Sequence, residues 1–161
     1  MPERVISNTS PLFYLHRLGQ LDLLQRLYQR LLVPEAVVEE LNAGRDQGED
    51  VPDVANYAWI EVHTVRAPEV VTLITDLGAG EAQVLALALE APGSLVLLDD
   101  RLARTVARMR NIRLTGTAGV LLKAKQEGHI SAVAPLLDRL LQLDFRLSNA
   151  VKASILKLAQ D

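Results

Sequence analysis

Short apolar runs alternate along the chain with longer segments in which apolar residues recur every three or four positions. The short runs are as long as buried strands, and capping residues or a proline lead from most of them into helical spacing. We expect strands at residues 4–8, 31–33, 59–65, 95–98 and 112–114. The run 59–65 alternates only in part, which is typical of an edge strand.

The helical segments are bounded by residues that commonly begin or end helices. Pro34 begins a helix over 35–41, and Ser131 and Ser148 are predicted to cap the last two helices, to about residues 143 and 158. The expected stops are Gly19, Asn111 and Gly128. Other helices are expected at 12–18, 21–28, 68–74 and 81–89, after residue 100 and before residue 128, with 42–53 as a mobile loop.

Strands that alternate with helices over most of a chain form a parallel sheet with helices on both faces. The segment 81–89 is apolar almost all round, so we expect it to lie centrally. The predicted fold class is α/β, a three-layer α/β/α sandwich around a central parallel sheet. A length of 161 residues suits one domain, 1–161, with C-terminal helices at about 131–158 packed on it or extending it.

The composition narrows the classes of function. Without cysteine, disulfides and thiolate metal sites are excluded, and with 4% aromatic residues no aromatic platform for stacking bases is expected. No apolar run approaches the length of a membrane span and the start lacks a signal-peptide pattern, so we expect a cytoplasmic protein with no membrane partner. The net charge is −3, but residues 101–125 hold seven Lys or Arg and no acid. That run is either a solvated helix face or a surface for a polyanion.

Two adjacent carboxylates, Asp99 and Asp100, directly follow the apolar run 95–98. Ligands of open α/β sheets bind at the carboxyl ends of the strands, so both residues stand where chemistry usually lies. The alternative is that one of them only caps the next helix, because Asp is a preferred N-cap residue. Similar groups at other strand ends would favour the first interpretation.

Three further oxygen-bearing side chains, Asn8, Glu40 and Glu81, lie near strand-to-helix junctions. Glu40 is on the flank of its helix and Glu39 nearly opposite the apolar face, so Glu39 should be the more exposed. Glu40 could also be a solvated helix acid, and Glu81 a first-turn acid that stabilises the helix dipole. Carboxylates gathered without His or Cys suit Mg²⁺ or Mn²⁺, which promote phosphodiester cleavage by activating water. We therefore expect these three side chains and one of the Asp pair to converge within about 10 Å.

The chain resembles PIN-domain proteins in five segments: VISNTSPL, VPEAVVEEL, LGAGEAQVLALALE, LVLLDDRLAR and IRLTGTAGVLLKAKQEG. Their order and spacing resemble the branch found as the toxin half of prokaryotic toxin–antitoxin pairs, over residues 5 to about 158. The resemblance implies a parallel α/β/α sandwich and RNA cleavage that depends on Mg²⁺ or Mn²⁺. It also implies a homodimer and a small antitoxin protein as inhibitory partner.

By position, the resemblance carries the family's acidic residues onto Asn8, Glu40, Glu81 and the pair Asp99 and Asp100. All five are implied metal ligands, and the four carboxylates are implied catalytic residues. Ser10 matches the small polar residue that helps to hold the metal or its water. Asn8 stands where the family usually has aspartate, and its carboxamide can donate an oxygen but carries no charge. We therefore expect weak catalysis.

Arg101, Arg104 and Arg108 form one stripe on the helix after the Asp pair. They could position RNA phosphates, form intramolecular ion pairs or receive an acidic antitoxin segment. Two alternatives to a nuclease stay open. One is a degenerate PIN-like domain that binds RNA or a protein without cleavage, which Asn8 favours. The other is a phospho-receiver-like module, although no further Asp and Lys pair stands at strand ends after Leu114.

Assembly is predicted from the many Leu residues between 12 and 32. They exceed what one face of a small sheet needs, so we expect a two-fold homodimer that buries apolar helix surface and leaves the basic stripe accessible.

Overall fold

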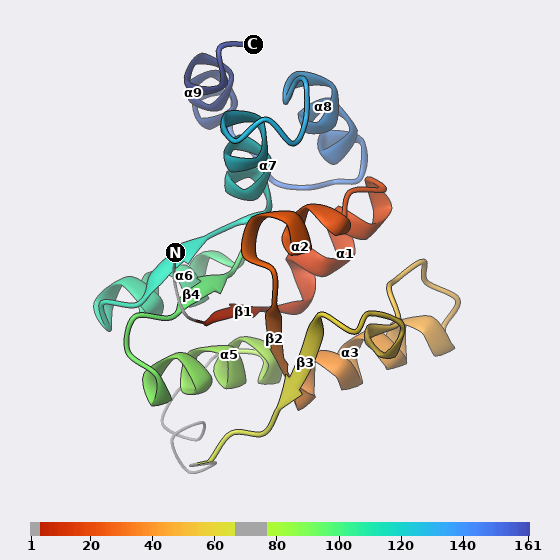
Figure 1. Ribbon diagram of the computed structural model, residues 1–161, viewed down its shortest axis with the longest axis vertical. Helices are drawn as coiled ribbons and strands as arrows, with labels where there is room; N and C mark the ends of the chain where they lie inside the picture. The colour runs from red at the N-terminus through yellow and green to blue at the C-terminus, as the bar shows by residue number, and fades with distance from the viewer. Residues whose placement is uncertain (1–3, 67–76) are drawn as a thin grey trace.

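The computed structural model describes residues 4–66 and 77–161, and its centre is a five-stranded sheet (Figure 1). The strands are β1 (Val5–Ser7), β2 (Leu31–Pro34), β3 (Ile60–His63), β4 (Leu95–Leu97) and β5 (Arg113–Thr115). Their order is β3-β2-β1-β4-β5, and every neighbouring pair is parallel. The predicted α/β class is confirmed, and so is the placement of the run 59–65 at an edge.

Helices lie on both faces of the sheet, which makes three layers (Figure 1). On one face α5 (Ala79–Glu90) packs against β1, β2 and β4. On the other, α1 (Thr9–Arg17) and α2 (Asp22–Tyr28) both contact α7 (Thr117–Gln126). α3 (Glu35–Asp46) contacts α1 and α5, and α6 (Arg101–Met109) contacts β5 and α5. α8 (Ala134–Gln142) and α9 (Asn149–Ala159) lie beyond α7, and a 3-10 turn, η1 (Val54–Asn56), precedes β3.

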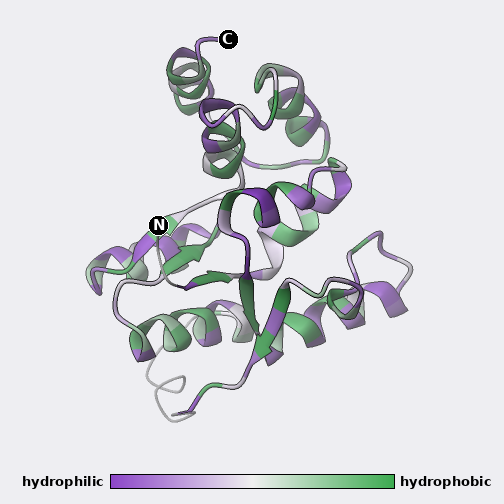
Figure 2. Ribbon diagram, viewed as in Figure 1, coloured by the Kyte–Doolittle hydropathy of each residue, from purple (hydrophilic) through white to green (hydrophobic). Residues whose placement is uncertain are grey.

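The core is aliphatic, as the green strands and α5 show in Figure 2. α5 is the helix predicted to be central, and it is buried around most of its circumference. Its buried residues are Gly80, Ala82, Val84, Leu85, Ala86, Leu87 and Ala88. None of the helices in the described ranges is long and apolar enough to cross a membrane.

The homodimer was predicted from the leucines between residues 12 and 32, and the structure buries these leucines within one chain. Leu12, Leu15, Leu23 and Leu24 are fully buried within one chain, and Leu31 and Leu32 lie in β2. The side chains on these helices are buried because α1 packs against α3 and α7, and α2 packs against β2 and α7. These residues therefore leave no apolar surplus for a second copy.

Two helix boundaries differ from the prediction. α3 continues to Asp46 instead of ending near residue 41, so the first part of the loop predicted at 42–53 is helical. Gly48, at φ +86°, follows the end of this helix. Ser131 does not cap α8, whose N-cap residue is Val133. The free N–H groups at that end instead donate to Asp161 from across the chain. The cap at Ser148 and the left-handed stop at Asn111 are confirmed, and the predicted helix 68–74 lies outside the described residues.

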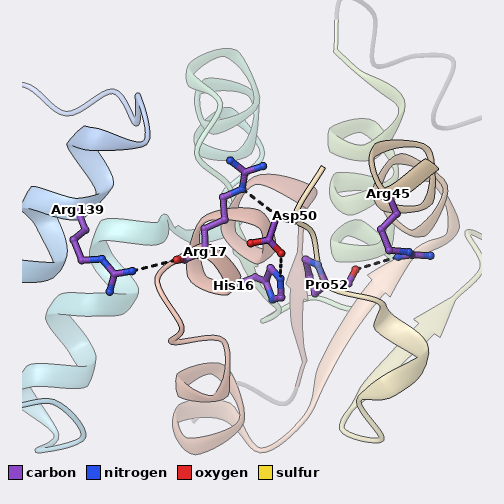
Figure 3. Close-up of polar contacts among 6 residues, drawn as sticks. All are labelled: His16, Arg17, Arg45, Asp50, Pro52 and Arg139. Atoms are coloured by element: carbon purple, nitrogen blue, oxygen red, sulfur yellow. Dashed lines mark hydrogen bonds and ion pairs between the residues drawn. The ribbon is translucent and has the colours of Figure 1, made fainter. Parts of the chain in front are cut away.

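The far end of α1 is anchored by polar contacts, which Figure 3 shows. His16 Nε2 lies 2.9 Å from Asp50 Oδ1, and Arg17 Nε donates to the Asp50 carbonyl at 3.2 Å. From α8, the Arg139 guanidinium donates to the carbonyls of Leu18 and Arg17. These contacts fix the direction of α1, whose first turn begins at the site described next.

Candidate active site

The site lies where the direction of chain travel across the sheet reverses. The chain moves from β1 outward to β2 and β3, then returns to β4 on the other side of β1. The crevice between the carboxyl ends of such a strand pair is the usual ligand site of an open α/β sheet. Asn8 directly follows β1, and its N–H donates to the Leu97 carbonyl at 3.0 Å. Asp99 stands two residues beyond β4, so both reach this crevice.

The first turn of α1 connects the two acidic sides of the site. Thr9 Oγ1 donates to Glu40 Oε2 at 2.6 Å, and Ser10 Oγ donates to Asp99 Oδ2 at 2.8 Å. Asn8, which precedes them, is the N-cap residue of α1 and is 2% exposed. The segment 8–10 thus brings Asn8, Glu40 and Asp99 together, and Ser10 is the residue of this segment that holds Asp99.

Gly80 makes room for two of these side chains at the start of α5. Its N–H donates to Glu40 Oε1 at 3.0 Å. A Cβ at this position would lie 2.7 Å from Glu40 Oε1 and 2.9 Å from Asn8 Oδ1. Only glycine leaves space for both oxygens. Glu40 and Glu39 are both exposed, but Glu40 is held by Thr9 and Gly80.

The structure separates the two aspartates after β4. Asp99 accepts hydrogen bonds from Ser10, from the Thr117 N–H at 2.8 Å and from Thr117 Oγ1 at 2.6 Å. Asp100 is the N-cap residue of α6, and its carboxylate accepts the Ala103 N–H at 2.9 Å. Asp99 therefore faces the site, and the capping alternative describes Asp100.

Glu81 follows Gly80 in the first turn of α5 and is partly buried. Its carboxylate turns back toward the N-cap residue, since a Cβ on Gly78 would lie 2.5 Å from Glu81 Oε2. This is the position in which an acid stabilises the positive end of a helix. Glu81 and the Glu40 contact lie at the same end of α5. The Glu81 carboxylate faces Gly78, however, whereas the Glu40 carboxylate faces Gly80.

The three arginines of the predicted stripe differ in their surroundings. Arg101 and Arg108 are exposed, whereas Arg104 is partly buried. Arg104 Nη1 and Asp99 Oδ1 approach Gly116 together, at 2.9 and 2.8 Å from the place a Cβ would take. Burial lowers the pKa of Arg104, the charge of Arg108 lowers it further, and Asp99 opposes both. The guanidinium remains a cation beside the site.

Sequence reasoning missed four residues of the site: Thr9, Gly80, Gly116 and Thr117. Thr117 could have been found, because it follows a predicted strand as Asp99 does. The glycines could not, because the side chains they accommodate come from other parts of the chain.

Tyr14, on α1, is affected by the charge of the site. Burial raises the pKa of its hydroxyl most, and the charge of Asp99 raises it further, so the hydroxyl stays protonated at neutral pH.

The atoms at this crevice that could bind a metal ion are all oxygens, which are the ligands that hard cations prefer. Asn8 Oδ1 is buried and has no hydrogen-bond partner in the part of the chain that the structure describes, so the burial of this carbonyl oxygen is uncompensated there. Within the described ranges no three His, Cys, Asp or Glu side chains are grouped closely enough to hold a metal. Asn8 Oδ1 and Glu40 Oε1 both approach Gly80, and Ser10 in the same turn of α1 holds Asp99, so an amide oxygen joins the carboxylates at this crevice. The residues present fit one cation held by mixed amide and carboxylate oxygens.

Comparison with known proteins agrees with the fold. A protein-family model described as a PIN domain matches residues 4–161. The chain therefore belongs to the PIN-domain family, a class with a nuclease-type fold. A search of curated proteins found no match.

Proposed function

We propose that this protein is a metal-dependent ribonuclease that cleaves RNA phosphodiester bonds with an activated water. The observation that carries the proposal is that Asn8, Glu40 and Asp99 lie together at the carboxyl ends of β1 and β4. Among the described residues, the buried Asn8 oxygen has no hydrogen-bond partner. Membership of the PIN-domain family supports the nuclease class.

Asn8 Oδ1, Glu40 and Asp99 are the groups that would hold Mg²⁺ or Mn²⁺, with Glu81 at the same helix end. When bound, such an ion lowers the pKa of a water and neutralises charge on the phosphate. Thr9 holds Glu40, while Ser10 and Thr117 hold Asp99. These hydrogen bonds fix the carboxylates before substrate arrives.

We assign the proton-accepting and charge-balancing roles to Glu40, Glu81 and Asp99. Asp100 contributes by starting α6, the helix that carries Arg101, Arg104 and Arg108 toward RNA phosphates. Arginine suits this role because its planar guanidinium matches two phosphate oxygens. All four carboxylates that the family resemblance implies thus keep a part in the proposal, with a different task for Asp100.

The decisive experiment measures cleavage of a mixed RNA pool by the purified protein in Mg²⁺, Mn²⁺ or EDTA. We expect cleavage with either metal and none in EDTA. Asp99→Asn should abolish it, whereas Asp100→Asn, which keeps a capping oxygen for the Ala103 N–H, should retain it. Cleavage that survives EDTA or Asp99→Asn would contradict the proposal.

Metal binding has a separate readout in thermal unfolding. A cation that binds only the folded protein raises the melting temperature. We expect Mn²⁺ to do so in the natural protein, and Asp99→Asn or Glu81→Gln to reduce the shift. An unchanged shift in both variants would place the ion elsewhere.

A second candidate function is a degenerate PIN-like domain that binds RNA or a protein partner without cutting. The observation in its favour is Asn8, a neutral and almost fully buried residue at the centre of the site. A small antitoxin as partner, a homodimer and a cytoplasmic location remain proposals of the family resemblance. The basic stripe offers an acidic antitoxin segment a complementary surface.

A further inference from the structure

We propose that a cavity away from the candidate active site binds a small phosphorylated molecule of nucleotide size. The cavity has a volume of about 430 Å³. It is lined by Arg4 and Arg30, which directly precede β1 and β2, whereas the candidate active site lies at the carboxyl ends of the strands. The two sites also lie at different ends of α5. Gly80, near its start, belongs to the active site, and Glu90, its last residue, lines the cavity.

Positive charge exceeds negative charge in this cavity. Three arginines and two carboxylates line it, and both carboxylates already have partners. Arg30 Nε donates to Glu61 Oε2 at 2.5 Å, and this hydrogen bond lowers the pKa of Glu61. Glu90 Oε1 accepts the Arg66 N–H at 2.6 Å. One positive charge is therefore left over, and an anionic ligand would balance it.

Arg4 is the cation that an anion would balance. It is partly buried, and in the part of the chain that the structure describes its Nε has no hydrogen-bond partner. Over the same ranges no carboxylate lies within ion-pair distance of its guanidinium. A partly desolvated cation is costly unless an anion joins it. Arginine suits phosphate in particular, because its planar group matches two phosphate oxygens.

A strained turn forms one side of the cavity. Gln29, which lines it, has φ 68° and ψ −44°, and the Arg30 N–H donates to the Tyr28 carbonyl at 2.8 Å. This is a γ-turn with a positive φ at its central residue, which is rare and strained for a residue other than glycine. Such strain is concentrated at functional sites and ligand clamps. Here the turn places Arg30 at the start of β2, where it meets Glu61.

The rest of the wall is apolar and accommodates more than a phosphate. Val5, Leu32 and Leu87 are buried side chains that line the cavity together with Tyr28. Burial and, less strongly, the charge of Glu127 raise the pKa of Tyr28 to about 12, so this residue adds no negative charge. The volume is in the range of small-ligand sites, about 300–1,000 Å³. A phosphate joined to an apolar or aromatic group, as in a nucleoside monophosphate, matches both parts of the wall.

Gln29 provides a charge test at nearly constant shape. Gln29→Glu adds one negative charge to the cavity, and Gln25→Glu makes the same change at an exposed residue of α2 outside the lining. For the cation, Arg4→Gln is paired with Arg26→Gln, which is also exposed on α2 and outside the lining. Both cavity variants should stay folded, because neither change removes a listed contact of the core.

The measurement is isothermal titration calorimetry with adenosine monophosphate in EDTA, so that no metal ion holds the phosphate at the active site. We expect one binding site in the natural protein. Gln29→Glu and Arg4→Gln should each bind about tenfold more weakly, the loss of one charge-assisted contact. Gln25→Glu and Arg26→Gln should bind as the natural protein does. Adenosine and inorganic phosphate should each bind more weakly than the nucleotide.

Three outcomes would overturn the inference. One is a natural protein that does not bind the nucleotide. Another is full affinity in both Gln29→Glu and Arg4→Gln, which would place the nucleotide elsewhere, for example on the basic stripe of α6. The third is equal affinity for adenosine and its monophosphate, which would exclude phosphate recognition. RNA cleavage does not enter this test, so the nuclease and the second site stand or fall separately.

Discussion

At the scale of single residues, the neutral carboxamide of Asn8 lowers the activity that is expected of the site. Its buried Oδ1 lies beside Glu40 at Gly80, yet it carries no charge. Asn8→Asp adds one anionic ligand at nearly constant shape. We expect tighter Mn²⁺ binding by calorimetry and faster RNA cleavage, because a carboxylate attracts the cation more strongly than an amide.

Without metal, the same variant should be less stable than the natural protein, by about 1–3 kcal/mol, because a buried carboxylate then lacks a compensating charge. Asn8→Asp combined with Asp99→Asn is the control, since it restores the original number of charges. If Asn8→Asp remains folded and gains neither affinity nor activity, the degenerate-domain alternative becomes the better account.

Gly80 offers a second test at the residue scale. Gly80→Ala favours the helix intrinsically by about 1 kcal/mol. The added methyl group, however, would stand within 3 Å of Glu40 Oε1 and Asn8 Oδ1 and must displace them. We expect the protein to stay folded while Mn²⁺ binding, measured by thermal shift, is weakened. Gly44→Ala is the matched control, because on α3 the atoms nearest to its methyl all belong to the flexible Glu49 side chain.

At the scale of elements, the C-terminal helices are tied together by Asp161. Its carboxylate accepts the N–H groups of Val133 and Ala134 at 2.5 and 2.7 Å and lies 3.4 Å from Lys125 Nζ. The Ala134 N–H lowers the pKa of Asp161 most, Val133 and Lys125 lower it further, and desolvation opposes them. The charged form therefore caps the start of α8.

This contact should make stability depend on pH in one direction. Because the pKa of Asp161 is lower in the folded than in the unfolded chain, its contribution is complete above the unfolded value. It is lost as the pH falls through the folded value. Asp161→Asn should lower the melting temperature at neutral pH, and the difference should vanish in acid. Asp138→Asn, which breaks an exposed pair with Lys152, should change it little.

At the scale of the whole molecule, assembly needs a surface other than the early leucines. Met109 is 76% exposed, and Leu102 lies on the same side of α6, seven residues before it. We propose this apolar strip for the homodimer. Light scattering at micromolar concentration should show a dimer, and Met109→Glu should shift it toward monomer. A natural protein that is monomeric at that concentration would contradict the proposal.

The alternation of strand and helix segments was readable because each element carries its own periodicity and stop signals. Gly19, Asn111 and Ser148 act within a few residues of themselves, and all three were placed correctly. Ser131 failed because the cap of α8 comes from Asp161, far along the chain. The predicted end of α3 was wrong because residues that are common in loops do not by themselves end a helix. The helix continues to Asp46, and the left-handed Gly48 follows its end.

The sequence by itself determined the fold class and the kind of atoms at the site, since apolar periodicity and residue chemistry are local properties. Only the tertiary structure decided which of two adjacent aspartates faces the site. Asp99 and Asp100 have equal chemistry, and their roles follow from distant donors, Ser10 and Thr117 for the one and the start of α6 for the other. The approach of Asn8 and Glu40 to Gly80 was likewise beyond the sequence, because these residues come from the end of β1, from α3 and from α5, which meet only on folding.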